Sequence, residues 1–301
     1  MANIMSHEKR KLILRLLCEG NSLRGTGRVT GTDKKAIGRL IMQFGAACQN
    51  FLDETLRGLD CPHVEVDEIW TFCLKKDARL TVEEKALEGR IGSIYLWTAL
   101  DAESKLLISY ALGKRSADMA RRFMVDLSER LVIPTPHESD QTGKFRIITR
   151  ISSDGFPGYS EAVDLAFASY ADYGQIIKDY RNADQPGRYA PPEMVATKRR
   201  VVKGSFSERL ICTSHVERHN LTIRTFMKRF ARLTIAFSKK FECLAAAVAM
   251  FVSYYDFVWR TRYPDESGRA GRLRPTAAMM AGVTNHLWSF DEFYETIIQY
   301  G

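Results

Sequence analysis

The order of strand-like and helix-like segments between residues 63 and 178 constrains the fold of this 301-residue chain more than any other feature. An alternating stretch begins at His63, and two β-rich stretches follow it. A helical pattern, a strand, a second helical pattern and a short strand come next. Three sequential strands followed by alternating helices and strands predict an α/β fold, a mixed sheet with helices packed on it. The expected strands cover residues 63–70, 91–100, 106–112, 147–154 and 175–178, and the expected helices cover 116–131 and 159–167.

Three short helices are expected before this sheet, within residues 6–45. Ser6, Ser22 and Thr32 can each cap one of them, because a side-chain oxygen at that position accepts from a free backbone N–H. The layout is that of a helix-turn-helix, although a plain three-helix packing module has the same pattern.

The third of these helices would present cations to DNA. Lys34, Lys35 and Arg39 face outward when Ile37 and Leu40 face inward. In a helix-turn-helix, such residues contact phosphates or base edges in the major groove.

The remaining sequence completes the domain organisation. Residues 181–197 contain three prolines and are expected to form a loop, and the chain from about Ser238 onward is expected to be helical. We therefore predict a DNA-binding domain at residues 1–62, a catalytic domain at 63–237 and a helical region at 238–301.

Positive charge is concentrated in two segments. Residues 198–240 carry 12 Lys/Arg and 2 acidic residues, and residues 1–50 carry 9 and 3. The formal net charge of the chain is +8, so the rest of the protein is acidic. A single basic run is usually a solvated face. Two separate basic segments on an otherwise acidic protein favour binding to DNA or RNA.

Other features exclude several protein classes. The longest uncharged apolar run, from Leu244 to Tyr255, is too short to span a bilayer. The first ten residues lack the apolar region of a secretory signal. Six cysteines occur without a Cys-x-x-Cys pair, which argues against a zinc ribbon and a disulfide framework. These features predict a cytoplasmic protein with reduced thiols.

Three acidic residues stand where catalytic groups are commonly placed. Asp154 follows the β-branched run 147–151 at a boundary between strand and turn. Asp67 lies in the middle of the first strand, where an unpaired carboxylate is costly to bury. Glu217 lies at the start of a helical pattern. Carboxylates gathered from two strands and a helix repel one another unless they share cations, so the trio predicts a divalent-metal site.

Each of these acidic positions also has an ordinary structural interpretation. An Asp-Gly pair is usually a turn, and an acid in a strand usually lies on the solvent face. A Glu in the first turn of a helix complements the helix dipole. The metal-site hypothesis therefore depends on the combination.

The helix expected to carry Glu217 also carries cations in phase with it. At about 100° per residue, Arg224 and Lys228 each fall within about 20° of Glu217. This face would place a metal ligand next to two cations that hold a phosphate or the flanking strand. A coincidence among surface residues is the alternative.

His215 and His219 are four residues apart and suggest a zinc hydrolase of the His-Glu-x-x-His type. Here, however, Glu217 lies about 200° around the helix from both histidines, and it could not act as their base. Contacts to phosphate, or to the groups that support the metal ligands, are the other expectation for these histidines.

Four motifs resemble the transposases of bacterial insertion sequences of the insertion-sequence-one type, which are DDE enzymes with an RNase H-like core. The resemblance runs from about residue 8 to 290 in the same order. The motifs are Val66-Asp67-Glu68-Ile69-Trp70-Thr71-Phe72, Leu112-Gly113-Lys114-Arg115-Ser116, Ser153-Asp154-Gly155, and His215-Val216-Glu217-Arg218-His219-Asn220 with Arg224.

The resemblance implies an RNase H-like sheet and a catalytic triad of Asp67, Asp154 and Glu217, with Arg224 as the accompanying basic residue. It implies two Mg²⁺ ions, replaceable by Mn²⁺, with Asp67 bridging both and the other two acids completing one each. The expected partner is double-stranded DNA, at element ends and at the target. The protein would act as a homo-oligomer on DNA in the nucleoid, away from membranes.

One element of some relatives is missing. Their cysteine zinc finger ahead of the helix-turn-helix has no counterpart in this sequence, so end recognition is expected to depend on the helix-turn-helix alone. Two other functions stay open. A DNA-binding regulator descended from a transposase would use the basic segments without chemistry, and an RNase H-type nuclease would cleave without transfer.

Overall fold

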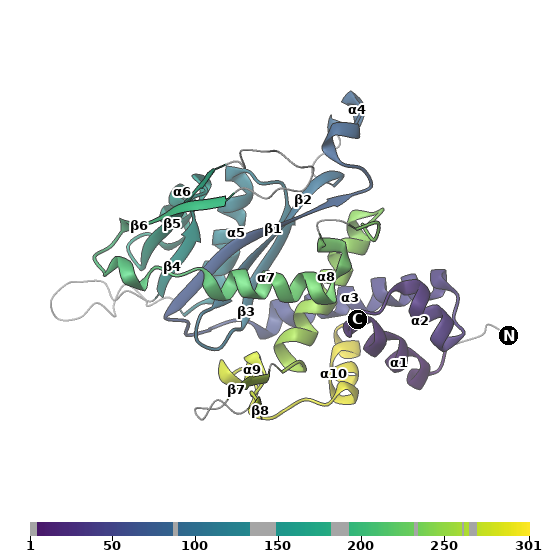
Figure 1. The fold of residues 1–301 in the computed structure, drawn as a ribbon. Coiled ribbons are helices and arrows are strands. Elements are labelled where there is room, and N and C mark those ends of the chain that lie inside the picture. The colour runs from purple at the N-terminus through teal and green to yellow at the C-terminus, as the bar shows by residue number, and fades with distance from the viewer. Residues whose placement is uncertain are drawn as a thin grey trace.

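A six-stranded sheet forms the centre of the computed structural model, which describes residues 5–86, 90–132, 149–181, 193–231, 234–260, 262–264 and 270–301 (Figure 1). The strand order is β3-β2-β1-β4-β5-β6. β1, β2 and β3 are antiparallel neighbours, β4 and β5 run parallel to β1, and β6 is antiparallel to β5. The strands are β1 (His63–Cys73), β2 (Gly92–Asp101), β3 (Leu107–Gly113), β4 (Thr149–Asp154), β5 (Ala171–Arg181) and β6 (Glu193–Lys203).

Helices pack on both faces of this sheet. α5 (Ala117–Arg130) and α6 (Gly158–Phe167) cover one face, where Trp97 of β2 lies 5.9 Å from Phe123 and 5.6 Å from Tyr159 between ring centroids. α7 (Ser214–Phe226) crosses the other face along β1 (Figure 1). The predicted mixed α/β sheet flanked by helices is confirmed, and it is consistent with an RNase H-like core.

The register of the two central strands places their acidic residues side by side. Glu65 of β1 is the partner of Ser152 in β4. Because side chains alternate between the faces of a strand, the positions two residues further on, Asp67 and Asp154, point to the same side. This is the side that α7 crosses.

The N-terminal region forms three helices: α1 (His7–Cys18), α2 (Leu23–Thr30) and α3 (Lys34–Thr55). Ser6 and Ser22 cap the first two as predicted. The expected cap at Thr32 is wrong, because the Asp33 carboxylate accepts from the Lys35 N–H at 2.8 Å. Gly31 ends α2 with a left-handed φ of 61°, which a residue with a Cβ adopts at a cost. Whether these helices act as a helix-turn-helix stays a prediction.

α3 is longer than the sequence suggested, and it packs along α8 (Phe241–Phe257). The two helices approach closely at Gly45, where an added Cβ would lie 2.5 Å from the Ala246 carbonyl oxygen. α10 (Phe290–Ile297) packs against both α1 and α3. One continuous cluster of buried apolar residues therefore joins the N-terminal helices, the sheet and the C-terminal helices.

Two predicted segments differ from the structure. The loop expected at residues 181–197 ends earlier: residues 182–192 lie outside the described part of the chain, and β6 begins at Glu193. The last region is not helical throughout, because β7 (Arg262–Pro264) and β8 (Ala270–Leu273) form a small antiparallel pair. The remaining short elements are η1 (Asp77–Arg79), α4 (Val82–Ala86), η3 (Glu208–Leu210), η4 (Lys228–Phe230), α9 (Ala277–Met280) and η5 (Ile298–Tyr300).

All six cysteines are free thiols, and four of them are buried. Among the described helices, none has the length and apolarity needed to cross a membrane.

Candidate active site

Three carboxylates meet where β1 and β4 lie side by side. One oxygen from each of Asp67, Glu68 and Asp154 lies within 4.8 Å of the others. Asp67 and Glu68 are consecutive in β1, and Asp154 ends β4. The structure thus brings together two of the acids singled out in the sequence and adds Glu68.

Asp67 is held in place from the overlying helix. The Asn220 side-chain N–H of α7 donates to Asp67 Oδ2 at 2.7 Å. Burial raises the pKa of Asp67 to about 7, and the charges of Glu68 and Asp154 add to this effect. An isolated aspartate would be fully ionised at neutral pH, so this site favours either a proton or another cation.

The Glu68 side chain is almost fully buried, with 2% of it exposed. The Tyr159 hydroxyl lies beside it on the same face of the sheet and favours the ionised form of Glu68. Burial and the neighbouring Asp154 raise the pKa of Glu68 to about 7, against the opposing effect of Arg115. Glu68 was not among the residues predicted from the sequence, and its position directly next to Asp67 was the available signal.

Arg115 bridges two of these acids. Its guanidinium lies 2.9 Å from Asp154 Oδ2 and 3.4 Å from Glu68 Oε2, and its Cζ atom lies 4.4 Å from the centre of the Phe156 ring. A second hydrogen bond, from the Phe156 N–H at 2.9 Å, fixes Asp154 Oδ1. A cation therefore already balances part of the negative charge at this point.

Glu217 projects from the first turn of α7, outside the group of three. Its Oε1 accepts from the Thr213 hydroxyl at 2.7 Å and pairs with the ammonium of Lys178 on β5. The Glu217 side chain is 43% exposed. The charge of Glu217 nevertheless contributes to the raised pKa of Asp67, so it belongs to the same electrostatic site.

The start of α7 is fastened to the sheet by a buried acid. Glu65, fully buried on β1, accepts from the backbone N–H groups of His215 at 2.9 Å and Val216 at 3.0 Å. Its other oxygen lies 2.7 Å from His215 Nδ1. A carboxylate at a helix N-terminus satisfies free N–H groups and complements the dipole. Together with the bond from Asn220 to Asp67, this contact sets the position of α7 along β1.

The helix phase was predicted correctly for Arg224 and incorrectly for Lys228. Arg224 lies two turns after Glu217 within α7, on the same side of the helix. The helix ends at Phe226, and Lys228 belongs to the short helix η4, so it does not continue the Glu217 face. The apolar Met227 and Phe230 turn into the core at this point and break the helical period.

The two histidines of the zinc alternative have separate surroundings. His215 is bound to Glu65. His219 is 3% exposed and makes an edge contact with Tyr255, with ring centroids 4.3 Å apart. Burial lowers the pKa of His219 to about 3, so its ring is neutral. The described contacts therefore do not point these two rings at a shared ion.

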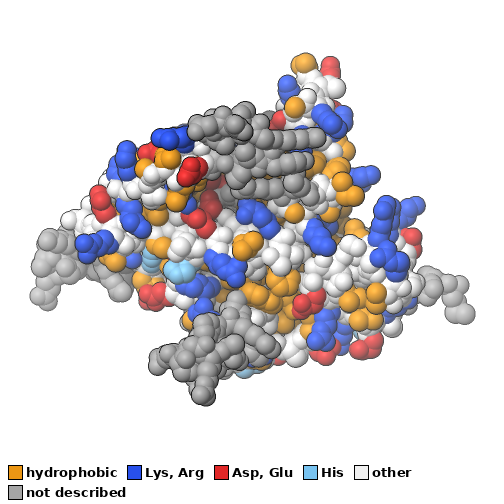
Figure 2. Space-filling view, viewed as in Figure 1, with side chains coloured by type: hydrophobic (Ala, Val, Ile, Leu, Met, Phe, Trp, Pro, Cys, Tyr) orange, Lys and Arg blue, Asp and Glu red, His pale blue; other side chains and the backbone are white. Residues whose placement is uncertain are grey.

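The three cations predicted to contact DNA from the N-terminal region lie on the first two turns of α3. Lys34, Lys35 and Arg39 are exposed, while Ile37 and Leu40 are buried. Lys and Arg side chains also spread across the face that α7 crosses, from the strands to the N-terminal helices (Figure 2). This face offers a polyanion many contact points.

Two comparisons with known proteins bear on this arrangement. Residues 190–258, which include α7 and α8, match a family model described as IS1 transposase. The protein InsB of the insertion element iso-IS1n, from Shigella dysenteriae, is 39% identical over 193 residues, which is 64% of this chain and 95% of InsB.

Proposed function

The chain belongs to the IS1 transposase family, and from that premise we propose that it cleaves DNA strands at insertion-sequence ends and joins them to a target. The observation that carries this proposal is the set of carboxylates from β1 and β4 beneath Glu217 of α7. Cations and exposed basic side chains surround these acids. Such a site binds metal ions and phosphates in preference to neutral substrates.

The residues fit divalent metal ions. Mg²⁺ and Mn²⁺ prefer oxygen ligands, and Asp67, Glu68 and Asp154 offer several within 4.8 Å. The raised pKa values of Asp67 and Glu68 mark negative charge that the protein alone does not compensate. When bound, two such ions activate an attacking oxygen and stabilise a leaving one. We propose Asp67, Asp154 and Glu217 as their principal ligands.

The surrounding side chains orient these ligands. Asn220 fixes the Asp67 carboxylate, while Thr213 and Lys178 hold Glu217 over the sheet. Arg115 neutralises Asp154 in the arrangement described, and it would shift toward a phosphate once cations replace it. Each of these contacts reduces the reorganisation needed when substrate binds.

Basic residues would hold the DNA. Arg224 lies on the Glu217 side of α7, where it would contact the scissile phosphate or its neighbour. Lys228 in η4 and the exposed Lys34, Lys35 and Arg39 of α3 would contact the flanking duplex. A homo-oligomer on nucleoid DNA would let two copies hold the two element ends.

The test is a strand-cleavage and strand-transfer assay with purified protein, DNA carrying the element ends, and Mg²⁺. Asp67→Asn, Asp154→Asn and Glu217→Gln should each abolish cleavage and transfer while DNA affinity and the melting temperature stay close to wild type or above it. Wild-type DNA binding without cleavage would support a regulator instead. Cleavage without joining would support a nuclease.

A further inference from the structure

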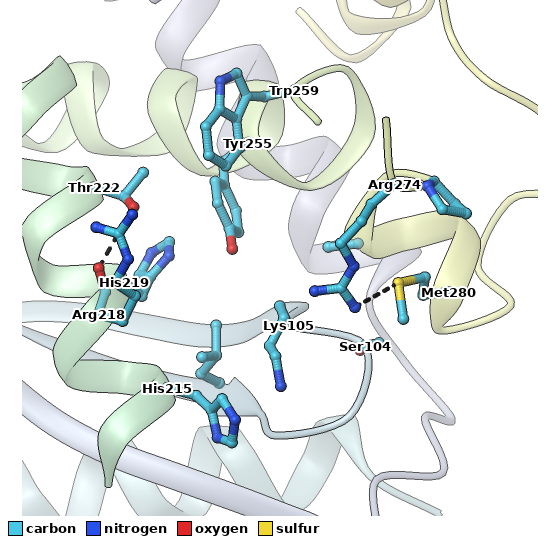
Figure 3. Close-up of a pocket in the computed structure, with 13 residues that line it drawn as sticks. Ser104, Lys105, His215, Arg218, His219, Thr222, Tyr255, Trp259, Arg274 and Met280 are labelled. Carbon is cyan, nitrogen blue, oxygen red and sulfur yellow. Dashed lines mark hydrogen bonds between the residues drawn. The ribbon is translucent and has the colours of Figure 1, made fainter. Parts of the chain in front are cut away.

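A second site lies on the flank of α7 that faces away from Glu217. A cavity of about 140 Å³ opens between α7, the turn joining β2 to β3, the end of α8 and the segment before α9 (Figure 3). Since one water occupies about 10–15 Å³ by the same measure, the cavity has room for about ten waters. It is thus large enough for a planar organic group rather than a single ion.

The cavity is cationic. Lys105, Arg218 and Arg274 line it from three different elements, and none of the described residues in its lining is acidic (Figure 3). Lys105 has a left-handed φ of 68°, an unusual conformation for a lysine, and its ammonium bonds to the Ala102 carbonyl oxygen. The structure therefore holds a cation at this cavity in a conformation that costs free energy. An anionic ligand is the one that this lining favours.

The opposite wall is aromatic. Tyr255 of α8 and Trp259, just beyond the end of that helix, stack on each other, with ring centroids 5.4 Å apart and an angle of 28° between planes. Tyr255 is buried, so Trp259 is the ring of the pair that is more open to a ligand. Aromatic faces next to guanidinium groups are the surroundings in which unstacked nucleobases are bound, because the base stacks and its phosphate pairs with the cation.

A buried polar side chain also lines this cavity without a partner. His219 is 3% exposed, and neither of its ring nitrogens has a hydrogen-bond partner among the described residues. A neutral imidazole offers one donor and one acceptor. Both nitrogens have almost no accessible surface, so His219 forms part of the apolar floor with Tyr255 and leaves the polar contacts to Lys105, Arg218 and Arg274.

We infer that this cavity binds one unstacked nucleotide of a DNA strand, with the base on Trp259 and its phosphate between Arg218 and Lys105. The inference deepens the proposed function, on which it depends for the source of the nucleotide.

The position of the cavity suits that role. His215, Arg218, His219 and Thr222 recur at helical spacing on one flank of α7, while Glu217 lies on the other flank. A helix with its side chains is about 10–12 Å across. A strand lying over the exposed ridge of α7 can therefore place one nucleotide in the cavity while a nearby phosphodiester reaches the carboxylates.

The test measures binding of 2′-deoxyadenosine 5′-monophosphate to the full chain by calorimetry, in EDTA so that the metal site does not contribute. Inorganic phosphate and 2′-deoxyadenosine are the comparison probes. We expect the nucleotide to bind at one site and more tightly than either probe. Arg218→Ala should weaken its binding about tenfold, as loss of a charge-assisted hydrogen bond does. The matched control is Arg122→Ala, an exposed helical arginine on α5, which should leave the affinity unchanged.

Two further measurements complete the test. Trp259→Leu keeps an apolar side chain and should weaken nucleotide binding about fivefold or more through lost stacking. A single-stranded oligothymidylate should displace the nucleotide, because the cavity must accept a residue of a strand. Nucleotide affinity equal to that of phosphate, equal effects of Arg218→Ala and Arg122→Ala, or failure of the oligonucleotide to compete would each overturn the inference.

The outcome is separable from that of the proposed function. Asp67→Asn should bind the nucleotide as wild type does, even where it loses strand transfer. Active transfer by wild type together with absent nucleotide binding would overturn the cavity site and leave the proposed function intact.

Discussion

Asp67→Asn should stabilise the metal-free protein at pH 8, because the wild-type carboxylate is held among other acids at a cost. The pKa of Asp67 is raised from 3.8 to about 7 in the folded protein. Its folded form therefore binds a proton more tightly than its unfolded form, so the stability cost is absent below about pH 4 and grows as the pH rises toward 7. Asparagine keeps the shape and can still accept from Asn220.

The size of the effect follows from the shift. A change of about three pH units corresponds to at most about 4 kcal/mol. Asp67 is partly exposed, and its surroundings relax and screen the charge, so about 1–2 kcal/mol is the expected gain at pH 8. That gain would raise the melting temperature by a few degrees, at about 2–4 °C per kcal/mol.

The assay is urea unfolding in EDTA at pH 8 and pH 5. At pH 5 the folded wild type already carries the proton, so most of the gain should disappear. The control is Asp126→Asn, whose carboxylate accepts from Ser109 Oγ at 2.5 Å and pairs with Arg130 at 2.8 Å, and which should destabilise the protein at pH 8. A gain that is absent at pH 8, or equal at both pH values, would refute the argument from carboxylate crowding.

Three other changes test separate parts of the account. Arg224→Ala should slow strand transfer about tenfold or more, as loss of a charge-assisted contact to phosphate does, while Arg122→Ala should not; equal rates would remove Arg224 from the site. Lys178→Met should lower the Mg²⁺ concentration that gives half of the thermal stabilisation, because it removes the cation that competes for Glu217; an unchanged or higher concentration would contradict this. The double variant Lys34→Ala with Lys35→Ala should reduce the slope of log affinity for duplex DNA against log salt concentration by about two. A slope unchanged from wild type would count against an N-terminal DNA contact.

The duplex-binding test of Lys34 and Lys35 uses the whole chain, because α3 packs against helices from the C-terminal part of the protein. Phe44 and Phe51 of α3 contact Phe293 and Phe257 at the other end of the sequence, with ring centroids 5.7 and 4.8 Å apart. A fragment of residues 6–45 would end within α3, expose Phe44, and lose the partners that order this helix. Periodicity predicted the three helices, but it could not reveal partners more than 200 residues away in the sequence.

Local patterns predicted the elements that the sheet needs. The alternation from His63 and the run before Asp154 gave β1 and β4, and the register of two parallel strands then places Asp67 beside Asp154. Glu68 escaped notice because alternation assigns it to the opposite face. Glu68 joins the group through Arg115, which pairs with Glu68 and also with Asp154 at the end of β4.

Tertiary contacts decided the features that sequence could not predict. Lys228 was predicted on the Glu217 face on the assumption that one helix continues through it. In the structure α7 ends at Phe226, where Met227 and Phe230 turn into the core. Arg229, next to Lys228, is also not an ordinary surface charge. Its guanidinium bonds to Ser238 Oγ at 2.6 Å, and burial lowers its pKa. A count of basic residues treats the two alike.

Metal-specific rescue of strand transfer tests the central claim most directly. A cysteine thiolate is a poor ligand for Mg²⁺ and a better one for Mn²⁺. Asp154→Cys should therefore be inactive in Mg²⁺ and regain measurable cleavage in Mn²⁺, whereas Asp154→Ala should stay inactive with both ions. Equal activity of the two variants in Mn²⁺, or wild-type activity of either variant in Mg²⁺, would contradict Asp154 as a metal ligand and with it the metal-dependent site proposed between β1, β4 and α7.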